Sequence, residues 1–260
     1  MKFLPAALLV AEFVLAFEVS AADDRYALFG KVLTPLFGVF AADAESGDRG
    51  LKLTVRIEQM TDLPAELAGA RAEIAVQAPD KLRLHGPLLG ENLTIVRDRQ
   101  RIWVSPGAKA KALLDSARLP KADKKFQLGD FKLPIPENQL VFLPVLFSIK
   151  DLGSEPFGGD VCRVLDLQLM AEIARSLEVE GWVARIWIRP DATPARLTLA
   201  RKGWNVVLRF EQVDFAATLP QSTWQPTSDE AADLFELPPK DYDRLLRAIV
   251  GMREKPKKRE

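Results

Sequence analysis

Hydrophobic and polar residues alternate along much of this chain. In the stretch LKLTVRIE, the apolar residues Leu51, Leu53, Val55 and Ile57 are separated by charged or hydroxyl-bearing residues. Because successive side chains of a β-strand point to opposite faces, this period of two predicts an antiparallel sheet with one apolar and one solvated face. The same alternation predicts about nine or ten strands in all, the others lying within residues 70–76, 81–84, 93–96, 102–104, 158–167, 182–188, 197–199 and 204–215.

The last of these strands changes phase along its length. Val206, Leu208 and Phe210 occupy even positions, whereas Val213 and Phe215 occupy odd positions. A strand keeps its apolar residues on one face across such a change only if one extra residue is inserted. The pattern therefore predicts a β-bulge or break at 211 or 212.

Helical spacing appears at both ends of the chain. Residues 24–40 place apolar side chains three and four apart behind Asp23 and Asp24, which are good N-cap residues, and Pro35 is expected to kink the helix or split it. Near the other end, Thr227 and Glu230 have the spacing of a capping box, and residues 239–251 have the composition of a further helix.

One segment is apolar on every side. Residues 137–150 contain eight apolar side chains between charged loops, and Pro144 favours a pair of short helical turns over one long helix. Such a segment must be covered on all sides or must itself cover another apolar surface. We expect it to form a lid over the apolar face of the sheet.

The first 22 residues are typical of a secretory signal peptide. Lys2 precedes an apolar run, and the small residues at the end place Val19 and Ala21 at the positions that a signal peptidase reads. Glu12 and Glu18 are unusual in such a run, which leaves an amphipathic N-terminal helix as the alternative. The sequence predicts a periplasmic protein with one domain over residues 23–251 and a charged, flexible tail over 252–260.

Composition and charge exclude several classes of function. The chain has 48% hydrophobic residues, 36 basic and 36 acidic residues, and a formal net charge of zero, so no overall field favours nucleic acid as a partner. Cys162 is the only cysteine and cannot form an internal disulfide. Its apolar strand setting predicts a small buried side chain.

The sequence offers little catalytic chemistry. His85 is the only histidine, and its position in the alternation predicts that it faces solvent, so neither a Ser-His-Asp triad nor a histidine metal site is expected. The carboxylate pairs Asp160 with Asp166 and Asp229 with Glu230 leave an acid-base enzyme as a minor alternative. We therefore predict no catalytic residues, no metal site and no cofactor.

Two neighbouring elements resemble a known family. The stretch VQAPDKLRL, residues 76–84, is followed by LTIVRDRQRIWV, residues 93–104, and this order after a helix and amphipathic strands is similar to the LolA-like family of periplasmic outer-membrane lipoprotein carriers. The resemblance implies a mainly β (α+β) fold, in which a strongly curved antiparallel sheet forms an incomplete β-barrel and helices with a lid cover its apolar concave face. Carriers of the family commonly place an arginine before the strand proline, where this chain has Ala78, so the polar latch which that arginine makes to the lid is expected to be missing.

The resemblance also implies a function. The protein would carry acyl chains of lipoproteins, or other lipids, between membranes without catalysis, as a monomer, with acylated lipoproteins or lipids as partners and possible contacts to inner- and outer-membrane transport proteins. Alternatively, the same fold could serve as a cell-envelope module that docks or senses a protein, or each apolar residue could simply pack a closed core. The candidate ligand-binding residues of the cavity and lid are Leu53, Val55, Ile57, Ile74, Val76, Leu82, Leu84, Ile95, Phe142, Leu143, Leu146, Phe147, Trp182, Ile186, Val206 and Leu208.

Overall fold

A computed structural model describes residues 24–41, 49–61, 68–88, 91–116, 129–239, 241–242 and 244–245 of the 260-residue chain. The expected signal peptide and the expected charged tail lie outside these residues. The helical elements are α2 (Asp24–Gly38), α3 (Gly107–Ser116), the 3-10 helix η2 (Glu137–Leu146), α4 (Ala171–Ser176), the 3-10 helix η3 (Gln221–Trp224) and α5 (Ser228–Ala232). The strands are β1 (Gly50–Met60), β2 (Arg71–Gln77), β3 (Lys81–Leu88), β4 (Glu91–Asp98), β5 (Arg101–Ser105), β6 (Phe147–Phe157), β7 (Asp160–Leu169), β8 (Val183–Ile188), β9 (Pro194–Arg201), β10 (Trp204–Ala217) and β11 (Phe235–Glu236).

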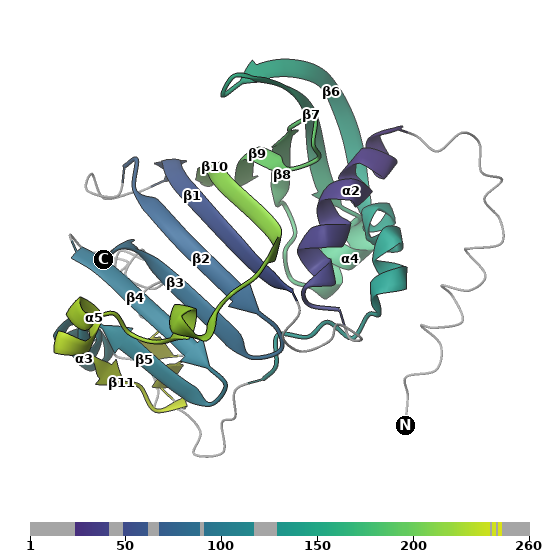
Figure 1. Ribbon diagram of the computed structural model, residues 1–260. Coiled ribbons are helices and arrows are strands. Elements are labelled where there is room, and N and C mark those ends of the chain that lie inside the picture. The colour runs from purple at the N-terminus through teal and green to yellow at the C-terminus, as the bar shows by residue number, and fades with distance from the viewer. Residues whose placement is uncertain are drawn as a thin grey trace.

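All eleven strands belong to one antiparallel sheet. Their order is β11-β5-β4-β3-β2-β1-β10-β9-β8-β7-β6, so the sheet is open, with β11 and β6 at its edges. The central pair β1 and β10 joins a half made of β1–β5 and β11 to a half made of β6–β10. Figure 1 shows the sheet bending beyond β10, with β6 and β7 curling away from β1 and β2.

The strand prediction was too low by at least one, because β6 and β11 were missed. The β6 sequence FSIKDLGSEPF contains Gly153 and Pro156 and lacks regular alternation in its second half, so a period of two is not visible there. Strand β11 is only two residues long and pairs with β5 through Phe235 and Glu236. A strand this short carries no periodic signal.

The predicted bulge in β10 is confirmed. Thr54 of β1 pairs with Gln212, but the next residue, Val55, pairs with Phe210, so Glu211 is the extra residue. The insertion allows Phe210 and Val213, which have opposite parity, to lie on the same face of the sheet as their β1 partners Val55 and Leu53.

Helix α2 packs against one face of the sheet, which we call the α2 face. Its Phe29, Val32 and Leu33 contact Leu165 and Ile186 of β7 and β8 in one core cluster. The C-terminal end of α2 belongs to a second cluster, with Leu36, Val39 and Phe40 against Leu51, Leu53, Ile74, Val76 and Leu82. A third cluster lies on the same face beyond them, where Leu93, Ile95, Ile102 and Val104 pack against α3 and against Leu237, Tyr242 and Leu245.

The opposite face, the α5 face, is not simply solvated, which corrects the expectation of one wet side. Trp103, Val96 and Ala75 pack there against Trp224 of η3 and are buried. Helix α5 starts with the predicted capping box, in which Thr227 and Glu230 exchange hydrogen bonds. The prediction for His85 also needs correction, because the side chain is half-buried on this face and its Nδ1 lies 2.8 Å from Thr94 Oγ1.

For proline, the structure contradicts the split expected as one alternative at Pro35 and the pair of helical turns expected around Pro144. Pro35 lies inside α2, which remains one helix over Asp24–Gly38 and is not split. The apolar insert forms a single 3-10 helix with Pro144 inside it, and from Phe147 the chain is already strand β6. Proline fixes φ near −65°, which lies within the range of a 3-10 helix, so the backbone at Pro144 can keep this conformation although one N–H donor is missing. No helix in the described part of the chain has both the length and the apolar character needed to cross a bilayer.

Candidate functional site

The register of the sheet aligns predicted binding residues into an apolar row across the α2 face. Leu53 pairs with Ile74, Ile74 with Leu84, Leu84 with Ile95, and Ile95 with Val104. Leu53, Ile74 and Leu84 are partly exposed, whereas Ile95 and Val104 are buried against α3. The row therefore offers a continuous apolar surface that becomes more accessible toward β1.

A second row runs parallel to the first one, two residues away along each strand. It consists of Leu51, Val76, Leu82, Arg97 and Ile102, which pair in that order across β1 to β5. Four of these residues are apolar, and Arg97 is the exception. Sequence reasoning missed Arg97, although its parity with Leu93 and Ile95 places a charge on the apolar side of β4 and could have drawn attention to it.

The centre of the α2 face lies between the helix-packed clusters. Val55, Ile57, Val206 and Leu208 of β1 and β10 point to this face, and among the residues described none of the four joins a cluster with α2 or α3. Val55 and Val206 are nevertheless buried, while Ile57 and Leu208 remain partly exposed. This central strip is the part of the predicted cavity that the helices cover least.

The remaining predicted strand residues lie on the same face but at its margin. Ile186 is buried in the cluster below α2. Trp182 stands just before β8, where it packs edge-on against Trp204 with ring centroids 5.1 Å apart and lies below the Arg201 guanidinium. The structure thus brings all twelve predicted strand residues to one face, and their role in binding remains a prediction.

The predicted lid residues divide between two environments. Leu143 and Phe147 join the cluster with α2, and Phe147 packs edge-on against Phe29 at 5.3 Å. Leu146 is partly buried. On the outer side of η2, Val141, Phe142 and Val145 are 60%, 53% and 54% exposed. Such an exposed group of large apolar side chains is unusual for a surface that contacts only water.

Helix η2 is held closely against α2. A Cβ atom placed on Gly30 of α2 would lie 3.5 Å from Pro144 Cγ, which is ordinary contact distance, so the two elements leave little room between them. The start of η2 is tied to the sheet by the ion pair between Arg49 and Glu137, at 2.7 Å. The insert is therefore packed on α2 from one side only.

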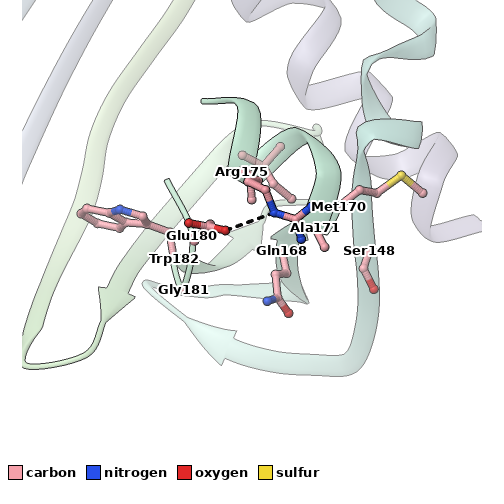
Figure 2. A pocket seen from close by; sticks show the side chains of 10 residues that line it. Ser148, Gln168, Met170, Ala171, Arg175, Glu180, Gly181 and Trp182 are labelled. Carbon is pink, nitrogen blue, oxygen red and sulfur yellow. Dashed lines mark ion pairs between the residues drawn. The ribbon is translucent and has the colours of Figure 1, made fainter. Parts of the chain in front are cut away.

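A pocket of about 380 Å3 lies near α4, at the ends of β7 and β8 (Figure 2). Figure 2 shows the Arg175 and Glu180 side chains meeting across it, at 3.6 Å, while Trp182 extends away from the side occupied by Met170 and Ser148. Trp182 is the only predicted binding residue in its lining. The pocket is lined by Ser148, Gln168, Leu169, Met170, Ala171, Ala174, Arg175, Glu180, Gly181 and Trp182.

Three of the four carboxylates that had suggested an enzyme are held in ion pairs, and the fourth, Asp229, is exposed. Asp166 binds Arg185 at 2.6 Å, and Asp160 lies 3.4 Å from Arg189. Glu230 accepts hydrogen bonds from Arg83 and Thr94, as well as from the Thr227 N–H. Burial alone raises the pKa of Glu230, but these hydrogen bonds and the Arg83 charge together outweigh it and hold the pKa below its ordinary value. Over the described ranges, no three metal-ligating side chains come together.

Comparisons with known proteins find distant structural similarity only. No family model matches the chain, and no curated protein matches it. Among solved structures, the lipoprotein LppX of Mycobacterium tuberculosis is 13% identical over 74% of this chain and 96% of its own, with a TM-score of 0.41. MucB is 14% identical over 80% of this chain and 65% of its own, with a TM-score of 0.42.

The family suggested by the sequence is also represented. A LolA superfamily protein of Nitrosomonas europaea is 12% identical over 78% of this chain and 97% of its own, with a TM-score of 0.29. At these identities and TM-scores the similarity is remote, and nothing about function follows from it.

Proposed function

We propose that this protein is a non-enzymatic carrier or binder of acyl chains, from lipoproteins or other lipids, and that it works in the periplasm. The observation that carries the proposal is the central strip of the α2 face. There, apolar side chains of β1 and β10 lie between two helix-packed clusters, and Ile57 and Leu208 remain partly exposed.

An acyl chain is the ligand that such a surface favours. Each methylene group transferred from water to an apolar site contributes about 0.8 kcal/mol, so a chain of roughly sixteen carbons represents on the order of 12 kcal/mol as an upper bound. The row from Leu53 through Ile74 to Leu84 supplies apolar contacts along one line. No catalytic group is needed for binding of this kind.

In this proposal η2 controls access to the apolar cluster beneath α2, which borders the strip where Leu197 pairs with Leu208. It packs on α2 through Leu143 and exposes Phe142 to the outside, so it has an inner and an outer apolar side. Movement of η2 away from α2 would expose the apolar cluster below it. The partners would be acylated lipoproteins or lipids, together with membrane transport proteins that load and unload them.

The proposal is tested by native mass spectrometry of the protein purified from an exporting host, with organic extraction of bound material. We expect a stoichiometric acylated species. Leu208→Trp, which fills the central strip, should reduce loading by about tenfold or more, because the added volume occupies the ligand's space. Val161→Trp is the matched control, since Val161 is an exposed apolar residue remote from η2.

One observation favours a second candidate, a cell-envelope module that docks a protein. Val141, Phe142 and Val145 form an exposed apolar group on η2, as expected of a docking surface. A protein that stays free of lipid after incubation with lipids and acylated lipoproteins would overturn the carrier proposal in favour of this one. Phe142→Asp should then abolish partner binding without changing the free energy of unfolding.

A further inference from the structure

Arg97 is a buried cation on the otherwise apolar α2 face. It is 2% exposed, and its cross-strand neighbours are Leu82 of β3 and Ile102 of β5. Charged side chains are almost never fully buried unless they are paired. The position of Arg97 therefore requires a specific explanation.

The contacts of Arg97 are with neutral groups. Its Nε donates to the Arg99 carbonyl at 3.0 Å and its Nη1 to the Gly129 carbonyl at 2.8 Å, while the guanidinium lies 4.6 Å from the centre of the Phe131 ring. Its Nη2 is buried and has no hydrogen-bond partner among the residues that the structure describes.

Three other arginines of the sheet are each paired with a carboxylate. Arg83 pairs with Glu230, Arg163 with Asp151, and Arg185 with Asp166. Arg97 forms no ion pair with any carboxylate in the described part of the chain. Desolvating a charge without a counter-ion costs several kcal/mol, which two carbonyl dipoles offset only in part. An anion brought to Arg97 would be stabilised by the same low dielectric that makes the lone charge costly.

We propose that Arg97 receives the anionic group of an amphiphile whose acyl chain lies along the neighbouring apolar row. This inference rests on the proposed function and narrows its ligand to acyl compounds with a carboxylate or phosphate head. Arg97 pairs with Leu82 of β3, and the partly exposed Leu84 lies two residues further along that strand, which is about 7 Å, so a head group at Arg97 and a chain running over Leu84 toward β1 can be bound side by side. A guanidinium suits either anion, since its planar N–H groups match both in a bidentate manner.

The carbonyl of Gly129 marks the path by which the anion reaches Arg97. Gly129 is exposed, and a Cβ atom added to it would meet no atom of the described residues within 4 Å, so none of them fills the space beside it. An anionic oxygen is a stronger acceptor than an amide carbonyl. It can replace Gly129 as the partner of Nη1 and at the same time satisfy Nη2.

The test compares charged and neutral ligands with the same chain, by displacement of a fluorescent acyl probe at pH 8. The pairs are palmitate with methyl palmitate, and palmitoyl lysophosphatidate with monopalmitoyl glycerol. We expect wild type to bind at least one anion about 10- to 100-fold more tightly than its neutral counterpart. This is the increase in affinity that one hydrogen bond to a charged group typically gives. The anion with the larger ratio identifies the head group as carboxylate or phosphate.

Variants then assign the preference to this side chain. Arg97→Gln should reduce the ratio to about one while methyl palmitate still binds, and Arg97→Lys should leave an intermediate ratio because lysine keeps the charge without the bidentate geometry. Arg163→Gln, at an arginine that is already paired with Asp151, is the control and should keep the full ratio. An unchanged ratio in Arg97→Lys and Arg97→Gln would overturn the assignment.

The wild-type measurement separates this inference from the proposed function. Equal binding of charged and neutral ligands overturns the anion site and leaves the carrier proposal intact. Failure to bind any of the four ligands overturns the carrier proposal itself. Neither result depends on whether a variant folds.

Discussion

Cys162 and Glu230 are both titratable side chains on the α5 face, but the sheet places them in opposite environments. Cys162 is completely buried with Val164, Trp187 and Ala195. Burial raises the pKa of its thiol, and the negative charge of Asp160 adds to the effect. Glu230 is surrounded by hydrogen-bond donors that keep it ionised.

The native thiol should therefore be unreactive. The thiolate is the nucleophile, and at Cys162 it is both disfavoured and shielded. We expect iodoacetamide to label the native protein about 100-fold or more slowly than the protein in concentrated urea, because labelling requires an opening of the structure. Equal rates in the two states, measured by mass spectrometry, would contradict the burial of Cys162.

Glu230 should make stability depend on pH under acidic conditions. Because its folded-state pKa lies below the unfolded value, its contribution is fully present above about pH 4.5 and is lost as the pH falls through the folded pKa. In urea unfolding between pH 7 and pH 3, Glu230→Gln should show a smaller loss of unfolding free energy than wild type. Asp229→Asn, which removes an exposed carboxylate from the same helix, is the control.

At the scale of elements, the β1 and β10 pair is the seam that joins the two halves of the sheet. Gly50 at the start of β1 makes this pairing possible, since a Cβ atom there would lie 2.8 Å from the Ala217 carbonyl oxygen and 2.4 Å from Leu219 Cδ1. Leu219 could move, but the backbone oxygen can do so only if β10 shifts. The seam is therefore sensitive to a single methyl group.

Gly50→Ala should lower the free energy of unfolding by about 1–3 kcal/mol, the usual cost of inserting a group into a filled site. Gly129→Ala adds the same methyl group where no atom lies within 4 Å, and it should change stability by less than about 0.5 kcal/mol. Urea unfolding curves of the two variants provide the comparison. Equal changes in the free energy of unfolding would mean that the close approach of Gly50 to β10 is not needed for the pairing of β1 with β10.

At the scale of the whole molecule, one continuous sheet links several separate core clusters. Trp103 and Trp224 belong to the cluster on β4 and β5, whereas Trp187 belongs to one on β7 to β9. Because the halves share the long β1 and β10 pairing, neither half can lose its strands without exposing the edge of the other. This connection favours cooperative unfolding.

We therefore expect urea unfolding curves followed by tryptophan fluorescence and by far-ultraviolet circular dichroism to coincide, as a two-state transition requires. Trp103→Phe and Trp187→Phe each remove one of the five tryptophans, so the difference between the wild-type curve and each variant's curve reports a tryptophan in one half. Two separated transitions, with different midpoints in the two variants, would show instead that the halves unfold independently.

Local patterns predicted several features correctly. The alternation identified β1 to β5 and β7 to β10, the phase change located the bulge at Glu211, and the spacing of Thr227 and Glu230 identified the cap of α5. The alternation also predicted correctly that the candidate strand residues lie on one face of the sheet. These features depend on the backbone geometry of a few consecutive residues, so the sequence contains all the information that they need.

Coverage of each face could not be predicted in the same way. Trp103 is buried by Trp224, 121 residues later, and donates a hydrogen bond to its carbonyl. Arg97 obtains its environment from Gly129 and Phe131, which follow a long connection after β5. Neither partner carries a local signal that marks it as one.

The sequence by itself therefore determined most of the strands, the face that each apolar side chain of those strands takes, and the point where the strand phase changes. Only the tertiary structure decided which parts of each face are covered, that η2 packs against α2, and that a lone arginine is buried within an apolar row. The physical reason is that strand geometry is set by neighbouring residues, whereas burial depends on which distant segments pack against a face.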